Sequence, residues 1–292
     1  MTNASRAGLL CRFALVSSTA VAVVLVSPHA ASADSILFSA SGGDAAAIQA
    51  TVDAFRAAIG GANNGSVVGE QPTGRREINW DGGGAAANAT LFPTPMNTFN
   101  SGATTRGLVS TTPGTGLEIS GQPTPEFGDI NATYPEIFQT FSSPRLFSAL
   151  NSNIIDVLFF VAGTATPAAV TSFGAVFTDV DLLSTSSLEL FSPSGSSLGT
   201  FFVPTSNNGL SFLGVTSTDS IGRVRIVSGN TALGPNDGGS IDVVALDDFI
   251  YSEPQAVPEP VSLLLLGTGL AGLAMSWRRG SRNRRDVSRP LR

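Results

Sequence analysis

The chain has 292 residues, of which 13% are charged, and a formal net charge of −6. Its only cysteine, Cys11, and its only histidine, His29, lie within the first 33 residues, and it contains no lysine. Residues 34–292 therefore cannot form disulfide bonds or metal sites with Cys or His ligands. A histidine base, a cysteine nucleophile and a catalytic lysine are likewise excluded there.

The N-terminal segment has the pattern of a secretory signal peptide. Two arginines precede the apolar stretch 13–26, and Ala31 and Ala33 flank a serine in a small-x-small cleavage site. The pattern predicts a signal peptide over residues 1–33 and a mature chain that begins at Asp34. The alternative is an uncleaved N-terminal anchor, which the break at Pro28 disfavours.

Residues 34–73 are expected to form an N-terminal arm and one helix. The segment 34–40 is predicted to be a short strand or extended arm. From Asp44 to Ile59, apolar residues recur at three- and four-residue spacing, an acid stands in the first turn, and two glycines follow. This is the pattern of an amphipathic helix with a stop signal.

Residues 74–256 have the pattern of an all-β domain. Short apolar segments alternate with turns rich in Gly, Pro, Asn and Ser, and no crossover helices are evident. We predict an antiparallel β-sandwich of jelly-roll type. Hairpins are expected between 105–111 and 116–120, between 187–191 and 198–203, and between 210–216 and 222–227. The Pro-rich segment 122–149 is expected to be an irregular loop that covers the core.

The exported part is strongly acidic. Between residues 34 and 260, seven arginines face 21 carboxylates, which gives a net charge of −14. Such a surface repels nucleic acid and anionic lipid, so neither is an expected partner. It also offers many oxygen ligands for hard cations such as Ca²⁺.

Four aspartates form the candidate metal site. Asp179 and Asp181 share one face of a predicted strand, and Asp247 and Asp248 lie in the last strand of the domain. The pattern is similar to that of calcium-bearing jelly-roll modules, and convergent carboxylates would need a cation to offset their repulsion. We therefore expect no required cofactor and name Ca²⁺ as the ion that these aspartates could bind. The alternative is that these aspartates are solvated charges at strand ends.

Trp80 and Asp81 form a second candidate site. They stand at the end of a predicted strand, before three consecutive glycines. They could form a sugar-binding or ion-binding edge, although a core tryptophan with a turn aspartate is the favoured interpretation.

The C-terminal segment, 257–292, has three parts in a fixed order. The tripeptide Pro258-Glu259-Pro260 is followed by the uncharged apolar run 261–277, and seven arginines come after it. The run would span about 25 Å as a helix, which indicates a transmembrane helix with its arginine tail in the cytoplasm. The alternative is a buried core helix with a basic tail.

The whole tail resembles the PEP-CTERM sorting signal of bacterial exported proteins. The resemblance implies that an exosortase-type membrane enzyme recognises Pro258, Glu259 and Pro260 and cleaves near them. The protein would be anchored transiently in the membrane and would then reach the cell surface or the extracellular space.

Three functions remain open at this stage. The first is a non-catalytic exported surface or extracellular-matrix protein with no catalytic residues. The second is a Ca²⁺-dependent carbohydrate-binding module, with extracellular polysaccharide as its partner. The third is a glycosidase or lyase, because glycoside chemistry with a carboxylate pair is the one enzymatic class that the composition leaves open.

Overall fold

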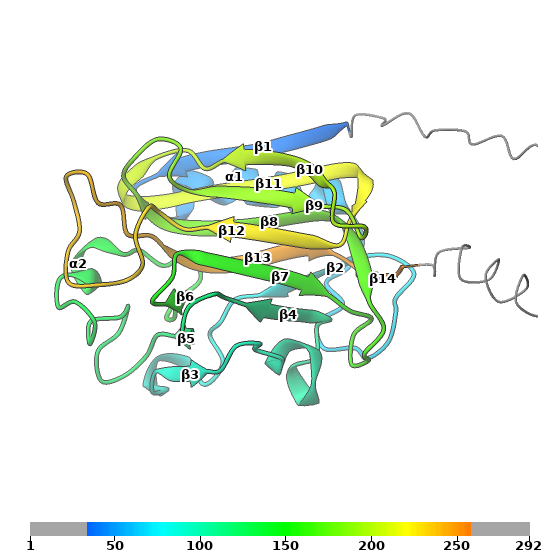
Figure 1. Ribbon diagram of the computed structural model, residues 1–292, viewed down its shortest axis with the longest axis horizontal. Helices are drawn as coiled ribbons and strands as arrows, with labels where there is room; N and C mark the ends of the chain where they lie inside the picture. Colours follow the sequence, from blue (N-terminus) through cyan, green and yellow to red (C-terminus); the bar gives the residue numbers. More distant parts are fainter. Residues whose placement is uncertain (1–33, 258–292) are drawn as a thin grey trace, which may run out of the picture. The chain divides into compact units, whose positions relative to one another are not determined.

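A computed structural model describes residues 34–257, which form two antiparallel β-sheets packed face to face (Figure 1). The predicted signal peptide, with Ala31 and Ala33, lies outside the described residues. So do Pro258, Glu259 and Pro260, the predicted transmembrane helix 261–277 and the arginine tail. Within residues 34–257, no helix is long and apolar enough to cross a membrane.

Strands dominate the secondary structure, as predicted. The strands are β1 (Ser35–Gly42), β2 (Arg75–Ile78), β3 (Thr90–Phe92), β4 (Leu108–Thr111), β5 (Gly116–Ile119), β6 (Phe147–Leu150), β7 (Ile154–Phe159), β8 (Ala168–Val180), β9 (Ser187–Phe191), β10 (Ser197–Phe202), β11 (Ser206–Ile221), β12 (Arg223–Val227), β13 (Ala245–Ser252) and β14 (Gln255–Ala256). The helices are α1 (Ala45–Ile59), α2 (Tyr134–Ile137) and the short 3-10 turns Gly84–Ala86, Thr98–Asn100 and Gly102–Thr104.

The larger sheet has nine strands, in the order β1-β11-β8-β13-β6-β5-β3, with β14 paired to β8 and β2 paired to β13. The second sheet has five strands, in the order β10-β9-β12-β7-β4. The main hydrophobic cluster lies between them and takes side chains from both, such as Phe173 and Phe249 on one side and Ile155 and Val224 on the other. The predicted class, a mainly antiparallel β-sandwich, is confirmed, and its finer assignment as a jelly roll stays a prediction.

Helix α1 packs on the outer face of the nine-stranded sheet, and its prediction is confirmed. Asp44 caps the N-terminus, because its carboxylate accepts a hydrogen bond from the backbone N–H of Ala47, 3.0 Å away. The Phe55 ring lies directly over Gly174 and Gly214, which pair across β8 and β11. A Cβ atom at either glycine would come within 2.8 Å of that ring, so the helix sits this close only because both positions lack side chains.

The three expected hairpins have different outcomes. β9 and β10 form the predicted hairpin. β4 and β5 do not pair with each other, because β4 joins β7 in the smaller sheet and β5 joins β3 and β6 in the larger one. β11 and β12 also belong to different sheets. In these two cases the turn carries the chain from one sheet to the other, which the spacing of strands and turns does not distinguish from a hairpin.

Most of the segment 122–149 covers the outer face of the larger sheet, as expected, but its last three residues belong to strand β6 of that sheet. Phe127, Tyr134 and Phe138 pack with Val243 and Ala245 in a separate hydrophobic cluster. Residues 34–257 thus contain three hydrophobic clusters, and the main one joins the two sheets.

Glu118 on β5 is a buried carboxyl with no counter-charge among residues 34–257. Its neighbours in the strand, Leu117 and Ile119, face the main core, so Glu118 projects from the opposite face of the sheet. The residue is 3% exposed, and its Oε1 has no hydrogen-bond partner among the described residues. Burial, reinforced by repulsion from Asp129, raises its pKa to about 7.

This environment predicts that the folded state becomes less stable as pH rises. The folded state keeps the Glu118 proton up to about pH 7, whereas an unfolded glutamate loses it near pH 4.5, so stability falls as pH rises between these values. Glu118→Gln should remove that dependence. The difference in unfolding free energy between this variant and the natural chain should increase in favour of the variant from pH 4 to pH 8. The increase should be at most about 3 kcal/mol. Urea titrations of residues 34–257 at several pH values measure this, and a gain that does not change with pH would contradict it.

Candidate functional site: an acidic cluster where β8 ends

Three carboxylates converge where β8 ends. Asp179 is the penultimate residue of β8, Asp181 follows the strand, and Asp237 comes from the loop between β12 and β13. One oxygen from each residue lies within 4.8 Å of the other two. The cluster therefore brings together two residues that the sequence predicts as metal ligands and one that it does not.

The carboxylates are held in place by the backbone around them. Asp179 has a left-handed backbone conformation, with φ = 68°, and is 2% exposed. Its Oδ1 accepts a hydrogen bond from the Asn208 N–H, 2.6 Å away. Asn208 lies where the register between β8 and β11 shifts, so the irregularity of β11 positions the Asp179 side chain.

The electrostatics of the cluster disfavour three simultaneous charges. Burial, followed by repulsion from Asp181, Asp237 and Asp242, raises the pKa of Asp179 to about 7. Burial and the same acidic neighbours raise the pKa of Asp181 as well. The Oδ1 atom of Asp181 is fully buried and has no hydrogen-bond partner among the described residues. A buried unpaired oxygen costs about 1–3 kcal/mol of stability, and more if it is charged. A cation bound between the carboxylates would remove this cost.

Asp242 accepts hydrogen bonds from the turn that carries Asp181. Its Oδ1 accepts a hydrogen bond from the Asp181 N–H, 2.9 Å away, and its Oδ2 accepts one from the Thr185 hydroxyl. The residue is fully buried, and both of its oxygens are engaged. It therefore fixes the turn that carries Asp181 and is not itself counted as a ligand.

Asp247 and Asp248 do not join Asp179 and Asp181. β13 does pair with β8, but in an antiparallel register that places Ala245 opposite Thr178 and Leu246 opposite Phe177. Continued toward the end of β8, this register brings Asp242 beside Asp181, while Asp247 and Asp248 lie farther along β13. The four predicted calcium ligands therefore do not form a single site.

Asp247 and Asp248 instead hold the covering segment against the sheet. Asp247 Oδ2 accepts hydrogen bonds from the Phe141 N–H at 2.7 Å and the Ser142 N–H at 3.2 Å. The Ser142 hydroxyl donates to Asp248, whose other oxygen lies 3.8 Å from the Arg56 guanidinium. Burial raises the pKa of both carboxyls, and the Asp248 charge raises that of Asp247 further.

The donor set fits a hard divalent cation. Carboxylate oxygens are the preferred ligands of Ca²⁺, which accepts six to eight oxygens in flexible geometry. Asp179, Asp181 and Asp237 would hold the ion, and Ca²⁺ would supply the charge that lets all three ionise together. Mg²⁺ demands near-ideal octahedral geometry and suits a site built from a strand end and a loop less well.

Trp80 lies in the core. It is 2% exposed, stacks on Phe147 with ring centroids 3.9 Å apart, and donates its indole N–H to the Asp247 carbonyl at 3.0 Å. Asp81 accepts a hydrogen bond from the Arg145 N–H at 3.1 Å. This arrangement matches the favoured interpretation, a core tryptophan with a turn aspartate. Trp80 also lines a cavity of about 250 Å³, and ligand binding by Trp80 and Asp81 stays a prediction.

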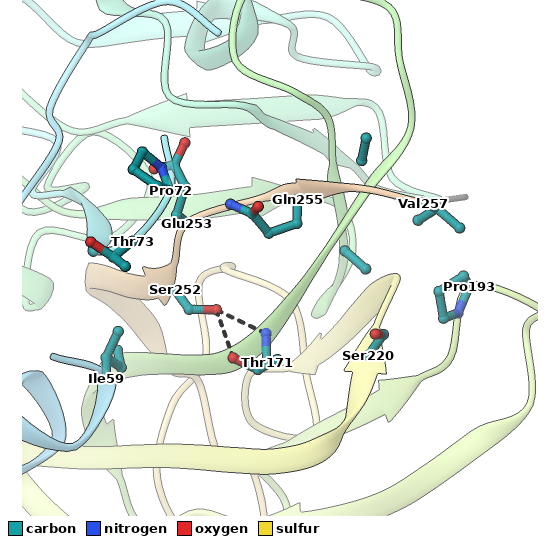
Figure 2. A pocket seen from close by; sticks show the side chains of 13 residues that line it. Ile59, Pro72, Thr73, Thr171, Pro193, Ser220, Ser252, Glu253, Gln255 and Val257 are labelled. Atoms are coloured by element: carbon teal, nitrogen blue, oxygen red, sulfur yellow. Dashed lines mark hydrogen bonds between the residues drawn. The ribbon is translucent and has the colours of Figure 1, made fainter. Parts of the chain in front are cut away.

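A larger cavity, of about 430 Å³, opens beside the last strand (Figure 2). Its wall carries short polar and aliphatic side chains, including Thr73, Thr171 and Ser252. Thr171 donates from both its N–H and its hydroxyl to the Ser252 Oγ, as the dashed lines in Figure 2 show. Glu253 is the one carboxylate in the lining, and it forms an ion pair with Arg76 at 2.6 Å.

Comparison with known families identifies the C-terminal segment. A family model of the PEP-CTERM protein-sorting motif matches residues 256–279. The chain therefore carries a PEP-CTERM sorting motif, which is a substrate signal for exosortase-type processing enzymes. Neither the curated proteins nor the solved structures gave a match.

The acidic cluster leads to a direct test. Ca²⁺ at 100 times its dissociation constant should stabilise residues 34–257 by about 2.7 kcal/mol, which raises Tm by roughly 5–10 °C for a domain of this size. Asp181→Asn and Asp237→Asn should each abolish most of this increment. Differential scanning calorimetry of EDTA-treated protein with and without Ca²⁺ measures it.

Asp219→Asn provides the control, because it removes the same charge from β11, outside the cluster. It should keep the full Ca²⁺ increment. An equal loss in all three variants, or no shift with millimolar Ca²⁺ in the natural chain, would reject the site.

Proposed function

We propose that this protein is a non-catalytic surface or extracellular-matrix protein, exported and then processed through its PEP-CTERM motif. Its folded part, residues 34–257, is the portion displayed outside the cell. Calcium bound by Asp179, Asp181 and Asp237 stabilises that portion. The observation that carries the proposal is the match of residues 256–279 to the sorting motif.

The folded part reaches into the sorting motif without an intervening linker. β14 pairs with β8, with Gln255 opposite Ala169 and Ala256 opposite Ala168. The next residue, Val257, donates its N–H to the Pro167 carbonyl at 3.1 Å. The first two residues of the matched segment are thus part of the fold, and the sorting signal follows it directly.

The cavities support a non-catalytic role. Hydrolysis of a glycosidic bond with a carboxylate pair requires two carboxyl groups about 5–9.5 Å apart across a substrate cleft. The cavity beside β14 has Glu253 as its sole acidic side chain, and this carboxylate is already paired with Arg76. The smaller cavity is lined by Arg106 and Arg145 and by no carboxylate.

The distribution of aromatic side chains disfavours the alternative of a carbohydrate-binding module. Such modules present several exposed aromatic rings to the sugar. Among residues 34–257, Phe202 is the one aromatic residue that is more than half exposed, at 53%. A glycan array probed with residues 34–257, with and without Ca²⁺, tests this alternative directly, and specific binding would support it over a purely structural role.

Processing provides the test of the proposal. Protein produced with a cognate exosortase-type enzyme should lack both residues 1–33 and the arginine tail, as measured by intact-mass spectrometry. Replacing Pro258, Glu259 and Pro260 together by alanine should leave the C-terminal segment attached and retain the protein in the membrane fraction.

Pro113→Ala is the matched control, because Pro113 is an exposed turn proline outside the motif. This variant should be processed like the natural chain. Surface-displayed protein that keeps its full C-terminus would contradict the proposal.

A further inference from the structure

The two sheets leave the same side of the sandwich open, where β1 is the edge of the nine-stranded sheet and β10 the edge of the five-stranded one. Figure 1 shows the two strands along one border of the folded part. Three residues separate the end of β10 from the start of β11, the neighbour of β1. We call this border the β1/β10 edge.

Within residues 34–257, β1 has none of the usual protection against strand pairing, and β10 has one such feature, an irregular register between Ser197 and Gly199. Exposed edge strands normally carry charged residues, proline or a β-bulge, or are very short. β1 has eight residues and β10 has six, and neither contains a charged residue or a proline. The opposite edges fit the usual rule better, because β3 has three residues and β4 has four.

Exposed apolar side chains gather on the β1/β10 edge. Ile36 is 64% exposed, Leu37 is 49% exposed and Phe202 is 53% exposed. Ile36 and Leu37 point to opposite faces of β1, because side chains alternate along a strand. Phe38, two residues after Ile36, packs against Phe55 of α1, so Ile36 lies on the helix side and Leu37 on the side of the second sheet.

Charge indicates which partner fits this edge. Residues 34–257 carry 20 carboxylates and seven arginines, so most of the surface repels a second copy and attracts basic molecules. The β1/β10 edge has no acidic side chain to bind a basic partner, and it is where a second copy meets the least repulsion. An antiparallel pair of identical strands is also self-complementary about a two-fold axis.

We infer that the β1/β10 edge is a homodimer interface, in which β1 of one copy pairs antiparallel with β1 of a second copy. The two larger sheets then form one continuous sheet across the dimer. Ile36 and Leu37 of each copy become covered beside the C-terminal half of the partner's β1, and Phe202 of each copy flanks the paired strands. Pairing of a single edge strand buries less area than a standard interface of about 1,600 Å², so the dimer is expected to dissociate at micromolar concentrations.

The ends of β1 predict the response to salt. Asp34 precedes β1 and Asp44 follows it, so antiparallel pairing brings the Asp34 of each copy toward the Asp44 of the other. Like charges at this separation are screened as ionic strength rises. The dimer should therefore become tighter, not weaker, between 50 mM and 500 mM NaCl.

Sedimentation velocity of residues 34–257 tests the interface over loading concentrations of about 1–300 μM. The natural sequence should shift from monomer to dimer across this range. Leu37→Lys should keep the protein monomeric throughout, because it places two ammonium groups in the paired strands. Leu91→Lys is the matched control, since Leu91 is 68% exposed on β3, at the opposite edge of the same sheet, and it should leave dimerisation unchanged.

A cross-linking measurement guards against variants that merely misfold. Residues 34–257 contain no cysteine, so Ser39→Cys introduces a single thiol near the middle of β1. Under mild oxidation this variant should form a disulfide-linked dimer at least tenfold faster than Leu91→Cys. A natural chain that stays monomeric at 300 μM, or equal cross-linking of the two variants, would overturn the inference.

Discussion

The scarcity of positive charge is the constraint on which the electrostatics of this fold depend. Residues 34–257 have seven arginines for 20 carboxylates and contain no lysine or histidine. The most buried ion pair joins Arg76 on β2 to Glu253 after β13, with Nη2–Oε1 and Nε–Oε2 distances of 2.6 and 2.7 Å. Arg76 also donates to the Gly65 and Gly69 carbonyls, so one guanidinium ties a loop, a strand and the C-terminal end of the sheet together.

The other arginines are also engaged inside the fold. Arg145 donates to four backbone carbonyls and one hydroxyl, and Arg106 donates to the Glu77 and Thr104 carbonyls. The remaining four bind carboxylates: Arg56 and Arg75 bind Glu77, and Arg223 and Arg225 bind Asp156. In the described part of the chain, none of the seven pairs with Asp179, Asp181 or Asp237. A cluster of three acids without an internal counter-charge is where an external cation would contribute most.

The sequence was informative wherever a feature is local. The helix from Asp44 to Ile59 was predictable because its cap, apolar spacing and glycine stop all lie within one short segment. The β9–β10 hairpin and the covering role of 122–149 were predictable for the same reason. Single β-strands were recognisable, but their partners were not, since the turn at Pro113 looks the same whether it joins paired strands or two sheets.

The candidate site was likewise predictable only where its residues are close together in the sequence. Asp179 and Asp181 could be placed together because they are two residues apart in the sequence, although Asp181 lies just beyond the end of β8. Asp237 was missed because its loop brings it to the cluster through the register of β13 on β8, which no local pattern encodes. Its one sequence signal is the run Asn236-Asp237-Gly238-Gly239, which indicates a turn and not a ligand. Asp247 and Asp248 look like ligands in sequence, yet this register directs them to the covering segment.

Crystals of residues 34–257 grown with Tb³⁺ in place of Ca²⁺ give the most direct measurement of the central claim, that the acidic cluster binds a cation. The account predicts one strong anomalous peak about 2.3–2.6 Å from carboxylate oxygens of Asp179, Asp181 and Asp237. A peak at Asp247 and Asp248, or none at the cluster in crystals soaked at millimolar Tb³⁺, would contradict it.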